Sequence, residues 1–479
     1  MTGHDADLIV IGAGPAGASA ALAAVKAGLK VVLIDEAHAA GGQIYRAPSS
    51  ALAAGCRSAG RDGAEGDRLR ASLADAEVRF VRNTRVWSVS ERFRVDAAGP
   101  DGACCFRAPR LVAASGAYER VVPFPGWTLP GVMGLAAATI LLKSEAMLPG
   151  RNVVVAGAGP LLAAVASKVA QAGGAVAAVV DVAPRREWLA MVPGLASRVD
   201  LLREGAGWVL NLARRGVPYY AASAIQKVER SGSAFVVTIG RVTAEGARIG
   251  GEPAAVIEGV DAVLVGNGLV PGGEITKLCG AEHFYDRLAG GWVPVLDACG
   301  RTSISGLYAT GDGAAIRGAA PALVSGALAG LAAARDSGRI DNEVFERLSQ
   351  PLKNDARRLA PFARAVASMM ALRPAQVADI APDTIVCRCE DVTRAEIETA
   401  LDDGAVDVNQ VKHFTRCGMG PCQGRMCGDV VGELVARRVG SREAAGVWTP
   451  RAPLRPVALG ELVGSYTYDD IPIPRPAPL

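Results

Sequence analysis

Short apolar runs alternate along the chain with glycine turns and longer mixed segments. The first run, in "DLIVIGAGPAG", ends at a glycine-rich turn; a stretch with no helix-breaking proline follows over Ala18–Ala27, and "KVVLIDE" is a second apolar run that ends in acidic residues. A short apolar run bounded by turn residues fits a buried parallel strand, and the stretch between two such runs fits the helix that connects them. This order predicts a β–α–β unit at the start of the chain.

The same plan recurs in the middle of the chain, over "RNVVVAGAGPLLAAVASKVAQAGGAVAAVVD". The apolar region Val153–Val182 is the longest in the sequence, but Lys168, Gln171 and several glycines interrupt it. A membrane-spanning helix needs about 20 consecutive, mostly apolar residues. We therefore expect a second strand–helix–strand unit and no transmembrane segment, and two such units predict an α/β protein with two nested Rossmann-like domains.

Composition narrows the class of protein. A chain of 479 residues should form more than one domain, and its formal net charge of +3 gives no electrostatic reason to expect a nucleic-acid partner. The sequence does not open with a basic flank, an apolar core and a small-residue cleavage site, so we expect a cytoplasmic protein. Five of the ten cysteines lie between Cys387 and Cys427. In a cytoplasmic chain this clustering favours a metal site over disulfides.

The first turn has the spacing of a dinucleotide-binding fingerprint, with three glycines followed by an acid at the end of the second strand. The first glycine allows the tight turn, the second lets the backbone approach a pyrophosphate, and the third lets the helix pack on the strand. Asp35 is placed to bind a ribose hydroxyl, and Glu36 is the second candidate. A glycine turn in an unrelated α/β unit is the alternative, but here all the parts occur in the required order. The candidate residues are Gly12, Gly14, Pro15, Ala16, Gly17, Asp35 and Glu36.

Three later motifs, "GGQIYR", "LVAASGAYER" and "GLYATGDGAA", resemble successive motifs of flavoproteins with two dinucleotide-binding domains, of the thioredoxin-reductase-like type. The resemblance implies FAD, with Asp312 against the ribityl and phosphate part of the cofactor. The residues that it adds to the site are Gly42, Gln43, Gly116, Gly311 and Asp312. No Cys-x-x-Cys occurs where disulfide reductases of this fold have one, and Cys104 and Cys105 are adjacent in a predicted strand. Thioredoxin-type chemistry is therefore disfavoured.

The second glycine turn departs from the fingerprint at one position. Gly157 and Gly159 match it, whereas Leu162 stands where the third glycine belongs, and Asp181 follows the next strand. A leucine there should push the helix away from the strand or shift the turn. In reductases that the chain resembles, this domain holds NADH or NADPH. Two alternatives stay open: a working site, for NAD(P) or another adenine nucleotide, and a structural remnant.

Two groups of cysteines each precede a predicted helix. Cys387-x-Cys389 lies in a loop before a helix that a capping box, Thr393 with Glu396, should start. "TRCGMGPCQGRMCG" precedes a second helix, "GDVVGELVARRV". Two helix entries that each bring thiolates can converge on one metal centre, because the positive end of a helix favours anionic ligands.

The metal in this centre is zinc or an iron–sulfur cluster. Zinc sites usually pair cysteines two to four residues apart and often include histidine, whereas Cys-x-Cys is tighter and His413 is the one histidine nearby. Gly418, Gly420 and Gly424 would let backbone N–H groups approach bridging sulfides, which a zinc site lacks. The residues favour the cluster, with zinc and a packing role of the cysteines as alternatives.

"CRCEDVT" and "GMGPCQGRMC" resemble the bacterioferritin-associated-ferredoxin-like [2Fe–2S] domain, a small helical domain. Five cysteines compete for four ligand places. The resemblance implies Cys387, Cys389, Cys422 and Cys427 as the ligands, because the position before the first glycine of the motif need not be cysteine in that family. Cys417 is then the spare, although the spacing alone also allows it.

Proline- and glycine-rich segments separate the predicted units. "PFPGWTLPGV" and "VGNGLVPGGE" resemble hinges on the two sides of the second nucleotide unit. The helix-like segment after residue 340 mixes basic and apolar positions, which favours packing on its own domain over contact with a partner. The proline-rich end of the chain cannot form a core and would wrap its own surface or a neighbour. We predict an FAD-binding domain over 1–127 and 273–340, an NAD(P)-like domain over 128–272, a helical connector over 341–380, the [2Fe–2S] domain over 381–440 and a tail over 441–479.

Over nearly its whole length the chain resembles the nucleotide-binding α subunit of heteromeric amino-acid and opine dehydrogenases, which include hydrogen cyanide synthase, opine oxidase and hydroxyproline dehydrogenase. The matching segments are "FPGWTLPGV", "GAGPLL", "RCGMGPCQGRMC" and "RAPLRPVALGELVG". The resemblance implies an electron-transferring oxidoreductase subunit for CH–NH donors, with little activity alone. An FAD-dependent partner of the D-amino-acid-oxidase type would oxidise an opine, hydroxyproline or a similar amino acid. In some relatives FMN lies at a subunit boundary. The resemblance also implies a small ferredoxin-like subunit, and we expect a cytoplasmic protein that is peripheral to the inner membrane through its complex.

The residues agree with that division of labour. We find no acid–base pair for amine oxidation and predict no catalytic residue, since His4, His38, His283 and His413 are scattered along the chain. A free-standing NAD(P)H-dependent reductase with FAD and the cluster is the alternative, and Leu162 counts against it. A non-enzymatic binding module is a third hypothesis, which the set of FAD motifs disfavours.

Overall fold

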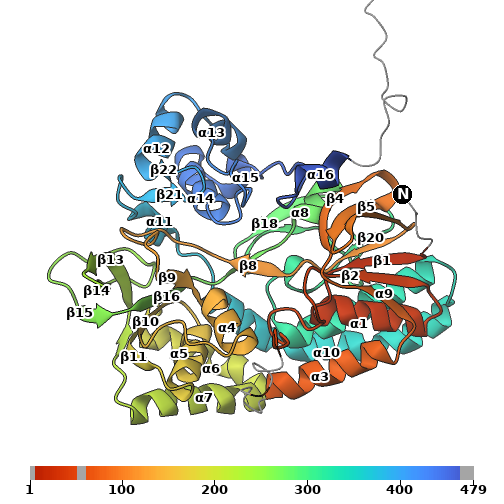
Figure 1. Ribbon diagram of the computed structural model, residues 1–479, viewed down its shortest axis with the longest axis horizontal. Coiled ribbons are helices and arrows are strands. Elements are labelled where there is room, and N and C mark those ends of the chain that lie inside the picture. Colours follow the sequence, from red (N-terminus) through yellow and green to blue (C-terminus); the bar gives the residue numbers. More distant parts are fainter. Residues whose placement is uncertain (1–5, 51–54, 56–60, 464–479) are drawn as a thin grey trace, which may run out of the picture.

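Two parallel five-stranded sheets form the frame of the computed structural model, and each has a glycine turn at the end of a central strand (Figure 1). The structure describes residues 6–50, 55 and 61–463. The strand orders are β20–β7–β1–β2–β3 and β12–β11–β10–β16–β9, and every pairing within these two sheets is parallel. Both predicted β–α–β units are present, so the predicted α/β fold is confirmed.

Alternate residues of the first sheet face opposite layers. Leu8, Val10 and Leu33 pack on the helices α1 and α9, whereas Ile9 and Ile34 face the three-stranded sheet β4–β5–β6. Both faces are covered, which explains why these strands are apolar at every position. The bounds are β1 Leu8–Ile11, β2 Val31–Ile34, β3 Val78–Val81, β4 Arg85–Ser90, β5 Arg94–Gly99, β6 Gly102–Arg107, β7 Leu111–Ala113, β20 Leu307–Ala309, α1 Pro15–Lys26, α3 Arg61–Ala74 and α9 Ala319–Asp336.

Helix α1 begins at Pro15, three residues before the predicted start at Ala18. Proline fits the first turn of a helix, where its missing N–H has no partner to lose, so Pro15 marks the start of α1. Strand β6 contains Cys104 and Cys105, as predicted.

The second sheet is built in the same way. Helices α4, α5 and α7 cover one face, and the antiparallel sheet β13–β14–β15 covers the other. The bounds are β9 Val132–Gly134, β10 Asn152–Gly157, β11 Ala175–Asp181, β12 Tyr219–Ala221, β13 Ser223–Ser231, β14 Ala234–Arg241, β15 Ala255–Val260, β16 Ala262–Gly266, α4 Leu135–Ser144, α5 Leu161–Gln171, α6 Arg185–Leu195 and α7 Val199–Arg214.

Two chain crossings and one long helix join the sheets. Strands β8 (Ala117–Glu119) and β17 (Leu269–Pro271) pair antiparallel between them. Helix α10 (Asn342–Met369) packs on both α9 and α6, and thus on its own chain.

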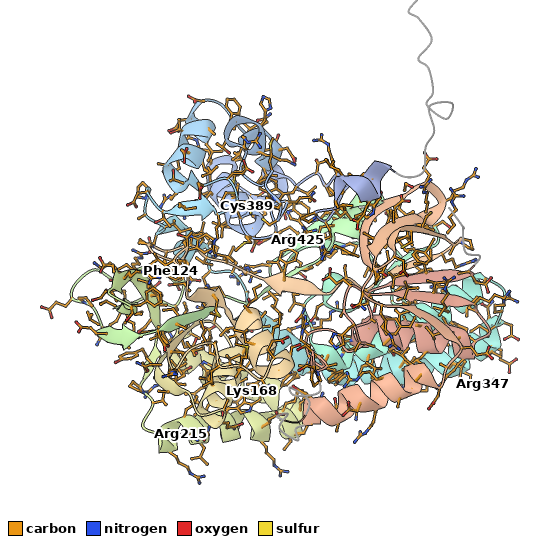
Figure 2. The ribbon with its side chains drawn as sticks, in the orientation of Figure 1. Phe124, Lys168, Arg215, Arg347, Cys389 and Arg425 are labelled. Carbon is orange, nitrogen blue, oxygen red and sulfur yellow. The ribbon has the colours of Figure 1, made fainter. Side chains whose placement is uncertain are left out.

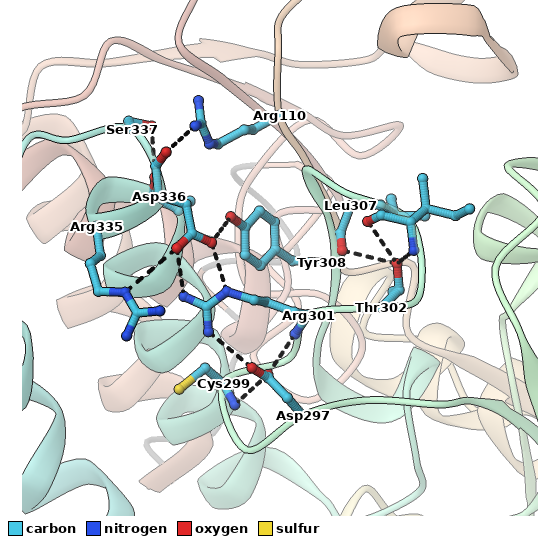
Figure 3. A network of polar contacts seen from close by, with 12 residues as sticks. Arg110, Asp297, Cys299, Arg301, Thr302, Leu307, Tyr308, Arg335, Asp336 and Ser337 are labelled. Atoms are coloured by element: carbon cyan, nitrogen blue, oxygen red, sulfur yellow. Dashed lines mark hydrogen bonds and ion pairs between the residues drawn. The ribbon is translucent and has the colours of Figure 1, made fainter.

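Arg301 bonds both carboxylate oxygens of Asp336 at the end of α9 (Figure 3). Among the helices of the described residues, none combines the length and apolar character needed to cross a bilayer.

The cysteine unit is a small helical body that lies across the junction of the two sheets (Figure 1). Its core is built from apolar residues of every helix from α11 to α15, and the predicted capping box of Thr393 and Glu396 starts α12. The bounds in this unit are α11 Pro374–Ala378, β21 Ile385–Cys387, β22 Val392–Thr393, α12 Arg394–Asp402, α13 Val408–Thr415, α14 Gly428–Val439 and α15 Arg442–Ala445. Three elements outside it are α8 Glu274–Leu278, β18 His283–Asp286 and β19 Gly291–Pro294.

The segment after α15 returns to the first sheet. Leu454 is 3% exposed and belongs to the core between β1 and the β4–β5–β6 sheet, and its N–H donates to Trp87 O at 2.6 Å. Helix α16 (Leu459–Val463) lies beside β6 (Figure 1). The described part of the predicted tail therefore wraps its own chain, and residues 464–479 lie outside the described residues.

Candidate functional site

Of the three glycines in the first turn, Gly12 and Gly17 have no room for a side chain, whereas Gly14 has room for one. A Cβ added to Gly12 would lie 2.3 Å from Ala114 O, and one added to Gly17 would lie 1.7 Å from Gly12 O. Strand, turn and helix are thus in backbone contact. A Cβ added to Gly14 would meet only Gly42 Cα, at 3.7 Å. In the fingerprint that direction belongs to the pyrophosphate, and the first turn has room for it.

Asp35 and Glu36 point in different directions. Asp35 accepts hydrogen bonds from Ala13 N at 2.5 Å and Ala37 N at 2.7 Å, so its carboxylate lies against the glycine turn. Glu36 faces solvent and pairs with Arg85 at 3.7 Å. Burial raises the pKa of Asp35 in spite of these bonds. Of the two candidates for ribose binding, Asp35 has the better position.

The other predicted FAD segments reach the same edge of the sheet. Gly42 packs against Gly14, and Gly313 against Gly116. Asp312 accepts from Arg317 N at 2.9 Å and Gly318 N at 3.0 Å, at the start of α9. Three of the remaining predicted residues are half-buried or buried close to the turn: Pro15 and Ala16 in the first turn of α1, and Gly311 against Ala16. The fourth, Gln43, is exposed and follows Gly42. An open backbone cradle with an acid at its rim fits a dinucleotide such as FAD.

The second turn has the same strand but different surroundings. Leu162 is buried at the α5–sheet interface, and α5 begins four residues after Gly157, whereas α1 begins three residues after Gly12. Pro160 before α5 already has helical φ and ψ values, so this one-residue difference shows no displacement of the helix, and the shift predicted from leucine stays a prediction. A Cβ added to Gly159 would lie 2.7 Å from Met370 Cγ, and Asp181 is fully buried. The predicted residues Gly157, Gly159 and Asp181 are near one another but enclosed.

The cysteines converge as predicted from their helix entries. The Sγ atoms of Cys387, Cys417 and Cys427 all lie within 4.8 Å of one another, and all three residues are buried. Cys389 and Cys422 are half-buried, and their thiols are hydrogen-bonded to each other. The ligand set predicted from the sequence omits Cys417, which the structure groups with two of the predicted ligands.

The surroundings of these thiols fit an iron–sulfur cluster. The three-residue group contains cysteine alone. Hydrogen bonds from Cys417, from Cys427 and from the backbone N–H of Gly418 and Glu390 hold the pKa of Cys387 well below its usual range. A Cβ added to Gly420 would lie 2.3 Å from Cys389 Cβ, so glycine lets the two cysteine loops touch. Thiolate ligands with backbone N–H donors are typical of such clusters.

The cysteine loop is joined to the first nucleotide unit by an ion pair that sequence reasoning missed. Arg425 Nε lies 2.6 Å from Glu274 Oε1, and Figure 2 shows Arg425 on the side of the cysteine unit that faces this junction. Glu274 follows Gly272, whose N–H donates to Gly116 O at 2.9 Å. The available signal was the position of an arginine between Cys422 and Cys427. Two predicted cofactor motifs are thus connected through a few residues.

A buried charge network lies beneath this contact. Arg120 is 3% exposed and donates to Asp429 Oδ2 at 2.6 Å, to Met370 O at 2.8 Å and to Gly290 O at 2.8 Å. Arg442 donates to Asp429 Oδ1 at 2.9 Å. Removing one partner would leave a buried charge uncompensated, at a cost of roughly 3–5 kcal/mol. The network therefore joins α14 and α15 of the cysteine unit to Arg120, which directly follows β8.

Glu119 makes the free energy of unfolding depend on pH. It accepts from Ala136 N at 2.7 Å at the start of α4, and burial raises its pKa to about 7. The folded state then binds this proton more tightly than the unfolded state, so the contribution to stability is complete below about pH 4.5 and is lost as the pH rises through about 7. We expect Glu119→Gln, which keeps an acceptor oxygen, to flatten the fall in urea midpoint between about pH 5 and pH 8. An unchanged pH profile in the variant would contradict this assignment.

Comparison with known proteins agrees with these observations. The family model "Pyridine nucleotide-disulphide oxidoreductase" matches residues 6–338, and "Sarcosine oxidase A3 domain" matches residues 381–465. The A subunit of opine oxidase from Agrobacterium tumefaciens is 35% identical, over 95% of this chain and 91% of its own length. The HcnB subunit of hydrogen cyanide synthase from Pseudomonas aeruginosa is 30% identical, over 94% and 96%.

A solved structure shares the fold over nearly the whole chain. The crystal structure of L-proline dehydrogenase from P. horikoshii superposes with a TM-score of 0.65 and 19% identity, over 96% of this chain and 79% of that one. At that identity the match concerns the fold alone.

Proposed function

The chain belongs to the pyridine nucleotide-disulphide oxidoreductase family, and to the group within it that includes the A subunit of opine oxidase; from this premise we propose that it is the electron-transferring subunit of a heteromeric amine dehydrogenase. It is an oxidoreductase subunit that would hold FAD at the first glycine turn and a [2Fe–2S] cluster at the cysteines. When bound, a flavin exchanges one or two electrons and such a cluster exchanges one at a time.

The observation that supports this function best is the contact between the two candidate cofactor sites. Arg425, from the cysteine loop, pairs with Glu274 of α8, and the backbone next to α8 is bonded to Gly116 of the first site. Burial, followed by the carboxylate of Glu274, raises the pKa of Tyr118 in strand β8. An ion pair that joins the two candidate sites supports a short path for electrons between them.

The described histidines lie apart from one another, and we propose that this chain does not itself oxidise the amine. His38 bonds Pro48 O at the surface, and His283 is held between Thr276 and Ala281 O, where burial lowers its pKa to about 4. His413 is on α13, and His4 lies outside the described residues. We therefore assign amine oxidation to an FAD-dependent partner of the D-amino-acid-oxidase type, with an opine, hydroxyproline or a similar amino acid as substrate. FMN at the boundary between subunits and a small ferredoxin-like subunit complete the proposal.

Co-expression tests the division of labour. The chain is produced alone and together with a D-amino-acid-oxidase-like protein encoded beside it, and both preparations are assayed on octopine, nopaline, hydroxyproline, sarcosine and glycine. We expect the two proteins to co-purify and only the pair to oxidise a substrate. Oxidation at the full rate by the chain alone would contradict the proposal.

A further inference from the structure

We infer that the second nucleotide fold is closed to NADH and NADPH by the chain itself: the Met370 side chain fills the pyrophosphate position, and Asp181 is withdrawn from the ribose position. This inference rests on the proposed function and specifies its electron source. The two glycine turns of one chain supply the comparison on which it depends.

A side chain covers the middle glycine of the second turn and, among the described residues, none covers the middle glycine of the first. A side chain on the middle glycine of the fingerprint would point at the pyrophosphate, which is why that residue is glycine. A Cβ added to Gly14, whose φ is −66°, meets only Gly42 Cα at 3.7 Å. A Cβ added to Gly159, whose φ is +91°, would lie 2.7 Å from Met370 Cγ, so the Met370 side chain packs directly on the second turn. Met370 comes directly after α10, far from this turn in sequence. Its thioether is an apolar group where a dinucleotide would place two negative charges.

In the second fold, Asp181, the acid that ends β11, already has hydrogen-bond partners of its own. Asp181 is 0% exposed and accepts from Tyr219 Oη at 2.5 Å, Trp188 Nε1 at 2.8 Å and Ala183 N at 2.9 Å. Asp35, by contrast, is half-buried and accepts from backbone N–H groups beside the turn. A ribose could reach Asp181 only if the hydroxyl of Tyr219 and the indole of Trp188 lost their acceptor.

Hydrogen bonds hold the backbone around Met370 in place. Its carbonyl accepts from Arg120, and Leu372 O accepts from Arg287 Nη1 at 3.2 Å. Arg373 donates to both oxygens of Glu187 on α6, at 2.8 and 2.9 Å. Residues 370–373 are at most 8% exposed. We name them the plug segment.

The cavity at the glycine turn of the second sheet is small. The cavity between Gly157, Val182 and Asn267 has a volume of about 50 Å³. A pocket for a small organic ligand usually holds roughly 300–1,000 Å³. The volume of this cavity is several times below that range. Reducing equivalents would then reach this chain from the amine through the partner, and the second fold would serve as a support for the cysteine unit.

Binding measurements on the full FAD-loaded chain test the inference. We expect no saturable heat with NADH or NADPH up to about 5 mM, no change in hydrogen exchange of the plug segment, and no bleaching of the flavin in anaerobic solution. Saturable binding of either nucleotide, or bleaching within seconds, would overturn the inference. If the pair with the partner still transferred electrons from an amine, the proposed function would survive that result. The absence of both nucleotide binding and amine-driven reduction would overturn the proposed function alone.

A double-mutant cycle tests the contact itself. Gly159→Ala should lower the melting temperature, because its Cβ meets Met370 Cγ and its φ is +91°. Met370→Ala removes the colliding atom, so the double variant should lose less than the sum of the two single variants. Strictly additive losses would overturn the placement of Met370 against the glycine turn.

Discussion

Gly14→Ala is expected to give a folded chain that has lost FAD. The backbone of Gly14 has a φ of −66°, which alanine adopts readily, and the added Cβ has only Gly42 Cα within 4 Å, at 3.7 Å. The methyl group would, however, occupy the direction reserved for the pyrophosphate. Bound FAD, measured from the visible absorbance and from the flavin released on heating, should fall by about tenfold or more, while the far-ultraviolet circular dichroism of the apoprotein stays unchanged.

Two other glycines provide the controls. Gly207 lies in α7, and a Cβ added to it meets nothing within 4 Å. Gly207→Ala should keep FAD and gain roughly 0.5–1 kcal/mol of stability, because alanine is the better helix former. In Gly17→Ala the Cβ would lie 1.7 Å from Gly12 O, so the fold itself should suffer. A Gly14→Ala protein with full FAD content would show that the first turn does not hold the cofactor.

Loss of a cluster ligand should have the second large effect. Cys387 and Cys427 belong both to the ligand set predicted from the sequence and to the buried group in the structure. A [2Fe–2S] cluster requires four protein ligands. Cys387→Ser and Cys427→Ser should therefore each lower the bound iron and acid-labile sulfide to a small fraction of the content of the unchanged protein. Cys104→Ser, in β6 and outside the cysteine unit, is the matched control and should keep both.

The remaining pair of variants decides the fourth ligand. The sequence-based set predicts that Cys422→Ser loses the cluster and that Cys417→Ser retains it. The structure places Cys417 Sγ 3.8 Å from Cys427 Sγ, so the reverse outcome would make Cys417 a ligand in place of Cys422. Iron and sulfide analysis of anaerobically purified protein, with electron paramagnetic resonance after dithionite reduction, distinguishes the two sets.

Local signals predicted the frame of the molecule well. The apolar runs around Gly12 and Gly157 indicated both central strands and their helices, because a parallel strand buried on two faces is apolar throughout. The capping box at Thr393 indicated the start of α12, since its two hydrogen bonds join residues three apart. The domain limits and the individual cofactor-binding residues stay predictions.

Contacts between distant segments were not predictable in the same way. Met370 reaches Gly159, Arg425 reaches Glu274, and Leu454 enters the core of the first sheet. Each pairing depends on how separate units pack, and no local periodicity or spacing encodes it. The sequence leaves the second nucleotide fold open between a working site and a remnant, because the residue that fills it comes from beyond α10.

The central claim is that this chain relays electrons from an amine oxidised elsewhere. Its most direct test is electron paramagnetic resonance of the co-purified complex, frozen after anaerobic addition of the substrate amine. The account predicts that the signal of a reduced [2Fe–2S] cluster appears with the amine, is absent when NADH replaces it, and is lost in the complex made with Cys387→Ser. A complex that oxidises the amine while the cluster stays oxidised, or a cysteine site that contains zinc and no labile sulfide, would contradict it.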